Sequence, residues 1–221
     1  MKVKNYLIGT LYRITANTYG DTNKYNEYAK AYELSRDSFQ KNLKDCDEMI
    51  MLTGEVDHIQ KMFKDHFFRI YEIWKSEPCN ILYCGPDTFC RKPLSIFGKF
   101  DNFCMFNYTD PRSAFGFKHF FNADVRYYPH NMEQDIWDLG LRMAEQWDLS
   151  VWNTEQIILN KMLWEQTIKF KDVYRPDIAW QGIWDKKGNG NIDLEDAKIV
   201  HFHATRNVKR AIDKMQKWSD K

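Results

Sequence analysis

Two short apolar segments of the sequence end in side chains that can bind a metal ion. Asp87 follows the segment 80–84, and His201 and His203 alternate within the segment 199–203. Both segments have the composition of buried strands, and alternate residues of a strand share one face, so the two imidazoles lie on the same side. A carboxylate at one strand end and an imidazole at another are the ligands that a divalent cation bridging a diphosphate needs.

Each of these residues also has a plainer interpretation. Asp87 follows Gly85-Pro86, and aspartate is common in such turns. A histidine in an apolar strand is often a hydrogen-bonded core residue, although two on one face, with Arg206 and Lys209 downstream, leave both interpretations open. The metal hypothesis therefore depends on whether the fold brings the two strand ends together.

Hydrophobic patterns along the chain predict the elements that position these residues. Apolar runs predict strands and helical spacing predicts helices, in this order: strand 3–14, helix 25–43, strand 48–52, a turn at Thr53-Gly54, helix 56–74 and strand 81–84. Beyond Asp87, less regular patterns predict strands 103–106 and 124–128 and helices 132–147 and 154–166. The alternation of strands and helices predicts an α/β fold with a mostly parallel central sheet flanked by helices. Such sheets bind ligands at the carboxyl ends of their strands, which is where Asp87 stands.

Length and composition favour one domain, residues 1–221, in a reducing compartment. The chain has 221 residues and a net charge of +1, which gives no reason to expect a nucleic-acid or acidic-membrane partner. It contains no apolar run long enough to span a membrane, and the N-terminal apolar stretch is too short for a signal peptide. The five cysteines are odd in number and form no Cys-x-x-Cys pair. We therefore expect a cytoplasmic protein, or one of the host cytoplasm if a virus encodes it.

Four segments, in this order, resemble the motifs of one enzyme family: Asn80–Phe89, Phe120–Asp124, Trp152–Asn160 and Ile199–His203. The family is the GT-A (Rossmann-like) nucleotide-sugar-dependent glycosyltransferases, and the resemblance is closest to the retaining glycogenin-like and lipopolysaccharide galactosyltransferase-like members. It spans residues 3 to 210, and it depends on the order of short motifs. The resemblance implies that Asp87 and His201 hold Mn²⁺ or Mg²⁺ against the diphosphate of a UDP-sugar.

The resemblance also implies a place for the nucleotide. Thr10 and Tyr12 match the end of the first strand, where the family holds uracil and ribose. Arg69 matches a basic residue that contacts the donor. Tyr12 is equally well explained as a core residue, and Arg69 as a solvated one.

Further matches imply a pocket for the sugar. Asn122 matches the asparagine of a Phe-Asn-Ser/Ala-Gly motif that touches the donor sugar. Glu155 and Gln156 match an acidic residue that binds sugar hydroxyls and a glutamine beside the anomeric carbon. Asp110 lies in a loop where the family has a sugar-binding aspartate. An Asp-Pro turn at Asp110 and a favourable helix N-terminus at Glu155 are the structural alternatives.

The sequence departs from the family pattern at three places. Gly85 replaces the first aspartate of the Asp-x-Asp motif, which predicts weaker metal binding and altered substrate preference. Asp124 stands where the family has glycine, so its carboxylate either enters the pocket or points into the sheet edge. The usual Lys-Pro-Trp sequence after the last strand is missing, so Arg206 or Lys209 is expected to neutralise the departing diphosphate, with His203 beside the donor.

The function that follows from the resemblance is transfer of a hexose from a UDP-sugar, with retention, to an unknown sugar, lipid or protein acceptor. Two alternatives stay open. Water could be the acceptor, which would make the protein a nucleotide-sugar hydrolase. Loss of the aspartate at Gly85 could also leave a nucleotide-sugar-binding protein without transferase activity.

Overall fold

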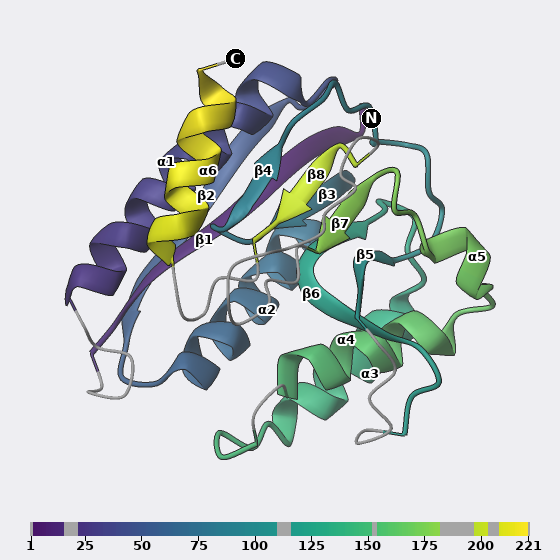
Figure 1. The fold of residues 1–221 in the computed structure, drawn as a ribbon. Coiled ribbons are helices and arrows are strands. Elements are labelled where there is room, and N and C mark those ends of the chain that lie inside the picture. Colours follow the sequence, from purple (N-terminus) through teal and green to yellow (C-terminus); the bar gives the residue numbers. More distant parts are fainter. Residues whose placement is uncertain are drawn as a thin grey trace.

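A five-stranded sheet forms the centre of the computed structural model, which describes residues 2–15, 22–109, 116–151, 154–181, 197–202 and 208–220 (Figure 1). The strand order is β2-β1-β3-β6-β5. The bounds are β1 Lys4–Ile14, β2 Glu48–Val56, β3 Cys79–Cys84, β5 Cys104–Thr109 and β6 Phe120–Tyr128. Strands β1, β2 and β3 are parallel, and β6 runs antiparallel to both β3 and β5. The prediction of an α/β fold with a mostly parallel sheet is confirmed.

Helices cover both faces of this sheet. Their bounds are α1 Thr22–Asn42, α2 Ile59–Ser76, α3 Gln134–Glu145, α4 Thr154–Glu165, α5 Phe170–Val173 and α6 Val208–Ser219. On β1, Gly9 faces Tyr32 of α1, whereas Tyr12 hydrogen-bonds to Asp65 of α2. Because odd and even residues of a strand point to opposite faces, α1 and α2 lie on opposite sides of the sheet. No helix in the described part of the chain is both long and apolar enough to cross a membrane.

A second, three-stranded sheet brings the C-terminal part of the chain to the end of β3. It has the order β4-β8-β7, with β4 Thr88–Cys90, β7 Ala179–Gln181 and β8 Ile199–His201. Strand β8 is antiparallel to β4 and parallel to β7. The apolar side of this small sheet and helix α6 pack against α1, as Figure 1 shows for the yellow helix beside the purple one.

The core explains much of the high aromatic content. Every residue of β3 is buried, as expected for a central strand covered on both faces. Trp137 of α3 is fully buried, stacks on Tyr128 of β6 with ring centroids 5.1 Å apart, and also contacts Phe67 of α2. These rings fix α2 and α3 against the sheet.

The predicted turn at Thr53-Gly54 is wrong. Strand β2 continues to Val56 because it pairs with β1 along its whole length, with Gly54 opposite Tyr12. A β-carbon on Gly54 would lie 2.6 Å from Cε1 of Tyr12. The glycine therefore serves the close approach of an aromatic ring within a strand, and not a change of chain direction.

Candidate metal and donor site

The short strand β4 brings Asp87 and His201 together. Thr88, the residue after Asp87, pairs with His201 of β8, and the amide of Phe202 donates a hydrogen bond of 2.8 Å to the carbonyl of Asp87. Nε2 of His201 lies 3.4 Å from Oδ1 of Asp87. Residues 114 positions apart in the sequence thus meet at the carboxyl end of β3.

Asp124 of β6 is the third member of this group. The register pairs Cys84 of β3 with Val125, and the amide of Gly85 donates a hydrogen bond of 2.8 Å to the carbonyl of Asp124. Oδ2 of Asp124 lies 3.1 Å from Nε2 of His201. One ligand atom from each of Asp87, Asp124 and His201 lies within 4.8 Å of the others. Two carboxylates and an imidazole fit the ligand preferences of Mn²⁺, and the carboxylates suit Mg²⁺.

The electrostatics of this group favour a positive charge. The side chains of His201 and Asp87 are 2% and 10% exposed, whereas that of Asp124 is 32% exposed. Burial lowers the pKa of His201, but the carboxylates of Asp124 and Asp87 outweigh this effect and raise the pKa to about 9. The two carboxylates thus create a negative potential at Nε2 of His201, and a divalent cation that binds there would displace the proton from the imidazole.

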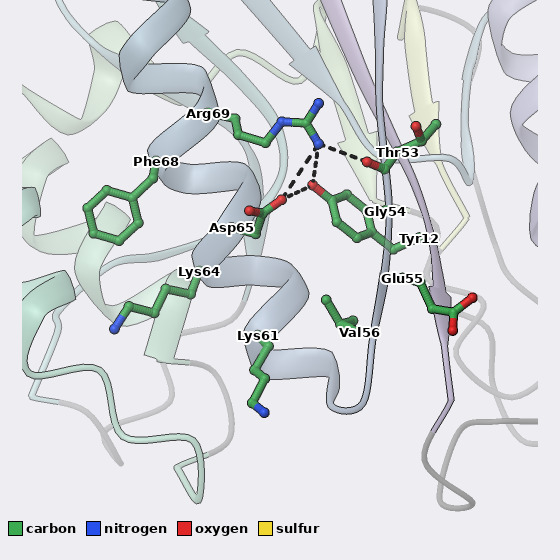
Figure 2. A pocket seen from close by; sticks show the side chains of 10 residues that line it. All are labelled: Tyr12, Thr53, Gly54, Glu55, Val56, Lys61, Lys64, Asp65, Phe68 and Arg69. Atoms are coloured by element: carbon green, nitrogen blue, oxygen red, sulfur yellow. Dashed lines mark hydrogen bonds and ion pairs between the residues drawn. The ribbon is translucent and has the colours of Figure 1, made fainter.

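A pocket of about 590 Å³ is lined by the C-terminal parts of β1 and β2 and by the first turns of α2 (Figure 2). Its lining residues are Tyr12, Thr53, Gly54, Glu55, Val56, Lys61, Lys64, Asp65, Phe68 and Arg69. Two of the residues predicted to bind the nucleotide, Tyr12 and Arg69, are therefore in one pocket. Its three basic side chains give it a positive balance over two acidic ones.

Hydrogen bonds fix the centre of this pocket. Nη1 of Arg69 donates to the hydroxyl of Tyr12 at 3.0 Å and to the carbonyl of Thr53 at 2.8 Å, and the Tyr12 hydroxyl donates to Asp65 (Figure 2). Burial, followed by the hydrogen bond to Asp65, raises the pKa of Tyr12 to about 12. The ring thus stays neutral and is held in one orientation. Thr10 is buried, and its hydroxyl forms a hydrogen bond of 3.0 Å with the Tyr83 hydroxyl.

Glu155 stands in the first turn of α4 and is only 4% exposed. Nη1 of Arg126 donates to its carboxylate at 2.8 Å, and Nε2 of His66 contacts the same oxygen. Burial raises the pKa of Glu155, but the charges of His66 and Arg126 outweigh it and hold the pKa below its usual value. Cζ of Arg126 lies 3.9 Å from the centre of the Tyr83 ring. The neighbouring Gln156 is half-buried, and its carbonyl accepts a hydrogen bond from Asn160.

Sequence reasoning missed Arg126 and His66. Arg126 stands among apolar and aromatic residues in segment 120–128, and a charged residue in such a segment was the one available signal. His66 lies on the apolar face of its helix, which is an ordinary place for a core histidine. Their role is evident only in the folded structure, where both side chains contact Glu155.

The other predicted site residues occupy different positions. Asn122 is buried on β6, and its side-chain oxygen accepts a hydrogen bond of 2.8 Å from the amide of Asp124. Lys209 is exposed in the first turn of α6. Asp110, His203 and Arg206 lie outside the described residues.

Several solved structures share the arrangement of this chain. A glycosyltransferase involved in the glycosylation of the major capsid of PBCV-1 aligns with a TM-score of 0.55 and 11% identity, over 97% of this chain and 99% of that one. The glycosyltransferase GlyE of Streptococcus pneumoniae TIGR4 aligns with a TM-score of 0.53 and 17% identity over 98% of this chain, which spans 60% of GlyE. The bifunctional WbbM aligns with a TM-score of 0.61 and 9% identity over 99% of this chain, which spans 52% of WbbM.

No protein-family model matches the sequence, and no curated protein sequence matches it. The likeness is therefore one of structure at low sequence identity. All three structural neighbours are glycosyltransferases, and the first of them matches this chain over almost the full length of both. The fold of this chain is a glycosyltransferase fold of the GT-A-like type.

Proposed function

We propose that this chain is a single-domain, metal-dependent glycosyltransferase that transfers a hexose from a UDP-sugar to a sugar, lipid or protein acceptor. The observation that carries the proposal is the meeting of Asp87 and His201 at the carboxyl end of β3, with Nε2 and Oδ1 3.4 Å apart. The sequence resemblance assigns the metal to these two residues, and the glycosyltransferase fold of the neighbours supports it. Bound Mn²⁺ or Mg²⁺ would supply positive charge to the diphosphate leaving group.

The nucleotide is assigned to the pocket of Tyr12 and Arg69. Tyr12 is only 7% exposed, but it lines this pocket, and Asp65 and Arg69 hold its hydroxyl, so the pocket wall that a base would meet is preorganised. Lys61 and Lys64 line the same pocket and give it a charge suited to an anionic ligand. Thr10 lies two residues before Tyr12 on the same face of β1 and orders this end of the strand through Tyr83.

The sugar is assigned to the first residues of β6 and the start of α4. Asn122 precedes Asp124 on one face of β6, Gln156 is half-buried in the first turn of α4, and Asp110 follows β5 in the sequence. Glu155 would hold the start of α4, and with it Gln156, in place through its ion pair with Arg126. Retention follows from the sequence resemblance, and since Arg126 and His66 engage the buried carboxylate of Glu155, we propose that it proceeds by attack on the same face as the departing diphosphate.

The departing diphosphate would gain negative charge as the glycosidic bond breaks. Arg206, Lys209 and His203 follow β8 in the sequence and are the candidates to neutralise it. Electrostatic stabilisation of this kind is usually the largest contribution that a protein makes to such a step.

The four buried cysteines and Cys46 form no disulfide bonds, which is consistent with the cytoplasmic location that we propose.

Calorimetry of UDP binding, with and without Mn²⁺, tests the proposal. We expect UDP affinity to fall when EDTA removes the metal, and UDP-hexose to be consumed when an acceptor panel is added. Unchanged affinity in EDTA would contradict the metal bridge. Release of free hexose without any acceptor would identify a hydrolase, and binding without turnover would identify a nucleotide-sugar-binding protein.

A further inference from the structure

We propose that Asp124 supplies, from strand β6, the cation-binding carboxylate that is missing at Gly85 at the end of β3. The inference rests on the proposed metal-dependent function and adds a ligand to its site. Gly85 lacks the aspartate of the family pattern, and Asp124 replaces the glycine of that pattern. We infer that these two differences compensate each other, because the carboxylate has moved from β3 to the neighbouring strand β6.

The first support is the space around Gly85. An ideal β-carbon on this residue would lie 2.8 Å from Oδ1 of Asp124 and 3.3 Å from both Cβ and Cγ of the same residue. Contacts below 3.0 Å require a shift of one of the two groups. The volume that a side chain at position 85 would enter is thus already occupied by the Asp124 carboxylate.

The second support is the register of the two strands. Tyr83 pairs with Arg126 and Cys84 with Val125, and the hydrogen bond from the amide of Gly85 to the carbonyl of Asp124 continues this antiparallel ladder. Gly85 and Asp124 thus lie opposite each other, and a β-carbon on Gly85 would lie on the same face as that of Asp124, only 3.3 Å from it. A carboxylate can therefore reach the same point from either strand.

The third support is the direction of the Asp124 side chain. Its Oδ2 lies 3.1 Å from Nε2 of His201, which is closer than the 3.4 Å from that nitrogen to Asp87. The amide of Asp124 is held by the side-chain oxygen of Asn122, which fixes the backbone at this point. The carboxylate therefore points into the metal group, and at 32% exposure it is the group's most solvent-accessible side chain.

Binding of Mn²⁺ to the full chain, measured by calorimetry in the absence of donor, tests the exchange. Asp124→Gly and Asp124→Asn should each weaken Mn²⁺ binding at least tenfold, because affinity depends on the number of charged ligands. Gly85→Asp alone should not strengthen it, because the two carboxylates compete for one space. The double variant Gly85→Asp/Asp124→Gly should return Mn²⁺ affinity to within about threefold of the original, and Asp172→Asn, an exposed aspartate of α5, serves as the control.

The outcomes separate this inference from the proposed function. If Asp87→Asn abolishes Mn²⁺ binding while both Asp124 variants keep it, the metal site stands and the exchange is wrong. Failure of the double variant to recover affinity, with circular dichroism showing a folded protein, also overturns the exchange. If the unaltered chain binds no Mn²⁺, both proposals fail together. The electron paramagnetic resonance spectrum of bound Mn²⁺ should change in Asp124→Asn and return in the double variant.

Discussion

Nη1 of Arg126 lies 2.8 Å from a carboxylate oxygen of Glu155, and both side chains are buried. Arg126 stands two residues after Asp124, so the same face of β6 carries a metal-group carboxylate and the cation that fixes the start of α4. The ion pair therefore links the candidate metal group to the helix that bears Gln156. Any change that moves α4 is expected to disturb the site through this strand.

The first prediction concerns acid stability. The pKa of Glu155 is held below its ordinary value of 4.5, so its contribution is present above that pH and is lost as the pH falls through the lower folded-state pKa. Glu155→Gln leaves Arg126 without its buried partner and should lower the free energy of unfolding by about 3–5 kcal/mol at pH 7. Urea denaturation at several pH values should show this difference shrinking below pH 4.5.

The matched control for that experiment is Glu165→Gln, at the exposed end of the same helix. It should change the free energy of unfolding by less than about 0.5 kcal/mol. An equal loss in both variants, or a difference that does not depend on pH, would contradict the role assigned to the ion pair.

The second prediction concerns the metal ligands. Asp87→Asn keeps the shape of the side chain but removes its charge, so Mn²⁺-dependent turnover should be abolished while the melting temperature changes little. His201→Ala should be equally severe, and more severe than His203→Ala. Steady-state assays with UDP-hexose over a range of Mn²⁺ concentrations measure both effects. Equal activity in all three variants would show that the site lies elsewhere.

The proximity of Asp87 and His201 could be predicted because both depend on local patterns. Each follows or ends a buried apolar strand, which predicted two neighbouring strand ends. The structure brings the two residues together through the antiparallel pairing of β4 with β8 in the second sheet, which the sequence pattern did not predict. The position of Asp124 could not be predicted, because it depends on the antiparallel register between β3 and β6. A shift of that register by one residue would have turned the Asp124 side chain to the opposite face.

Contacts between buried residues that lie far apart in the sequence could not be predicted either. The ion pair of Arg126 and Glu155 joins residues 29 positions apart, and no local pattern indicates which buried charges meet. The sequence predicts a turn at Gly54 because glycine readily adopts the backbone angles of turns. In the structure, Gly54 is needed because a side chain at this position would collide with the Tyr12 ring. That contact depends on the pairing of β1 with β2, which the local sequence does not indicate.

The third prediction separates the sugar from the nucleotide. Gln156→Ala should lower UDP-hexose turnover at least about tenfold, equivalent to about 1.4 kcal/mol, and leave UDP affinity nearly unchanged. Tyr12→Ala should weaken both, because Tyr12 lies in the pocket assigned to the nucleotide. Glu155→Ala should also reduce turnover at least tenfold, but because it removes the buried partner of Arg126 it should lower the melting temperature as well. Calorimetry with UDP and kinetics with UDP-hexose distinguish these effects, and a loss of UDP affinity in Gln156→Ala would contradict the assignment.

The fourth prediction uses the close approach of Gly54 to Tyr12. A β-carbon at position 54 would meet the ring at 2.6 Å from Cε1 and 3.0 Å from Cδ1, so Gly54→Ala must displace the ring. Because the Tyr12 hydroxyl is held by Asp65 and Arg69, the displacement should break at least one of these hydrogen bonds and destabilise the protein by about 1–3 kcal/mol. UDP affinity measured by calorimetry should fall in the same variant. Met51→Ala, an exposed change in the same strand, should alter neither quantity. Normal UDP binding by a stable Gly54→Ala protein would show that the nucleotide does not use the Tyr12 pocket.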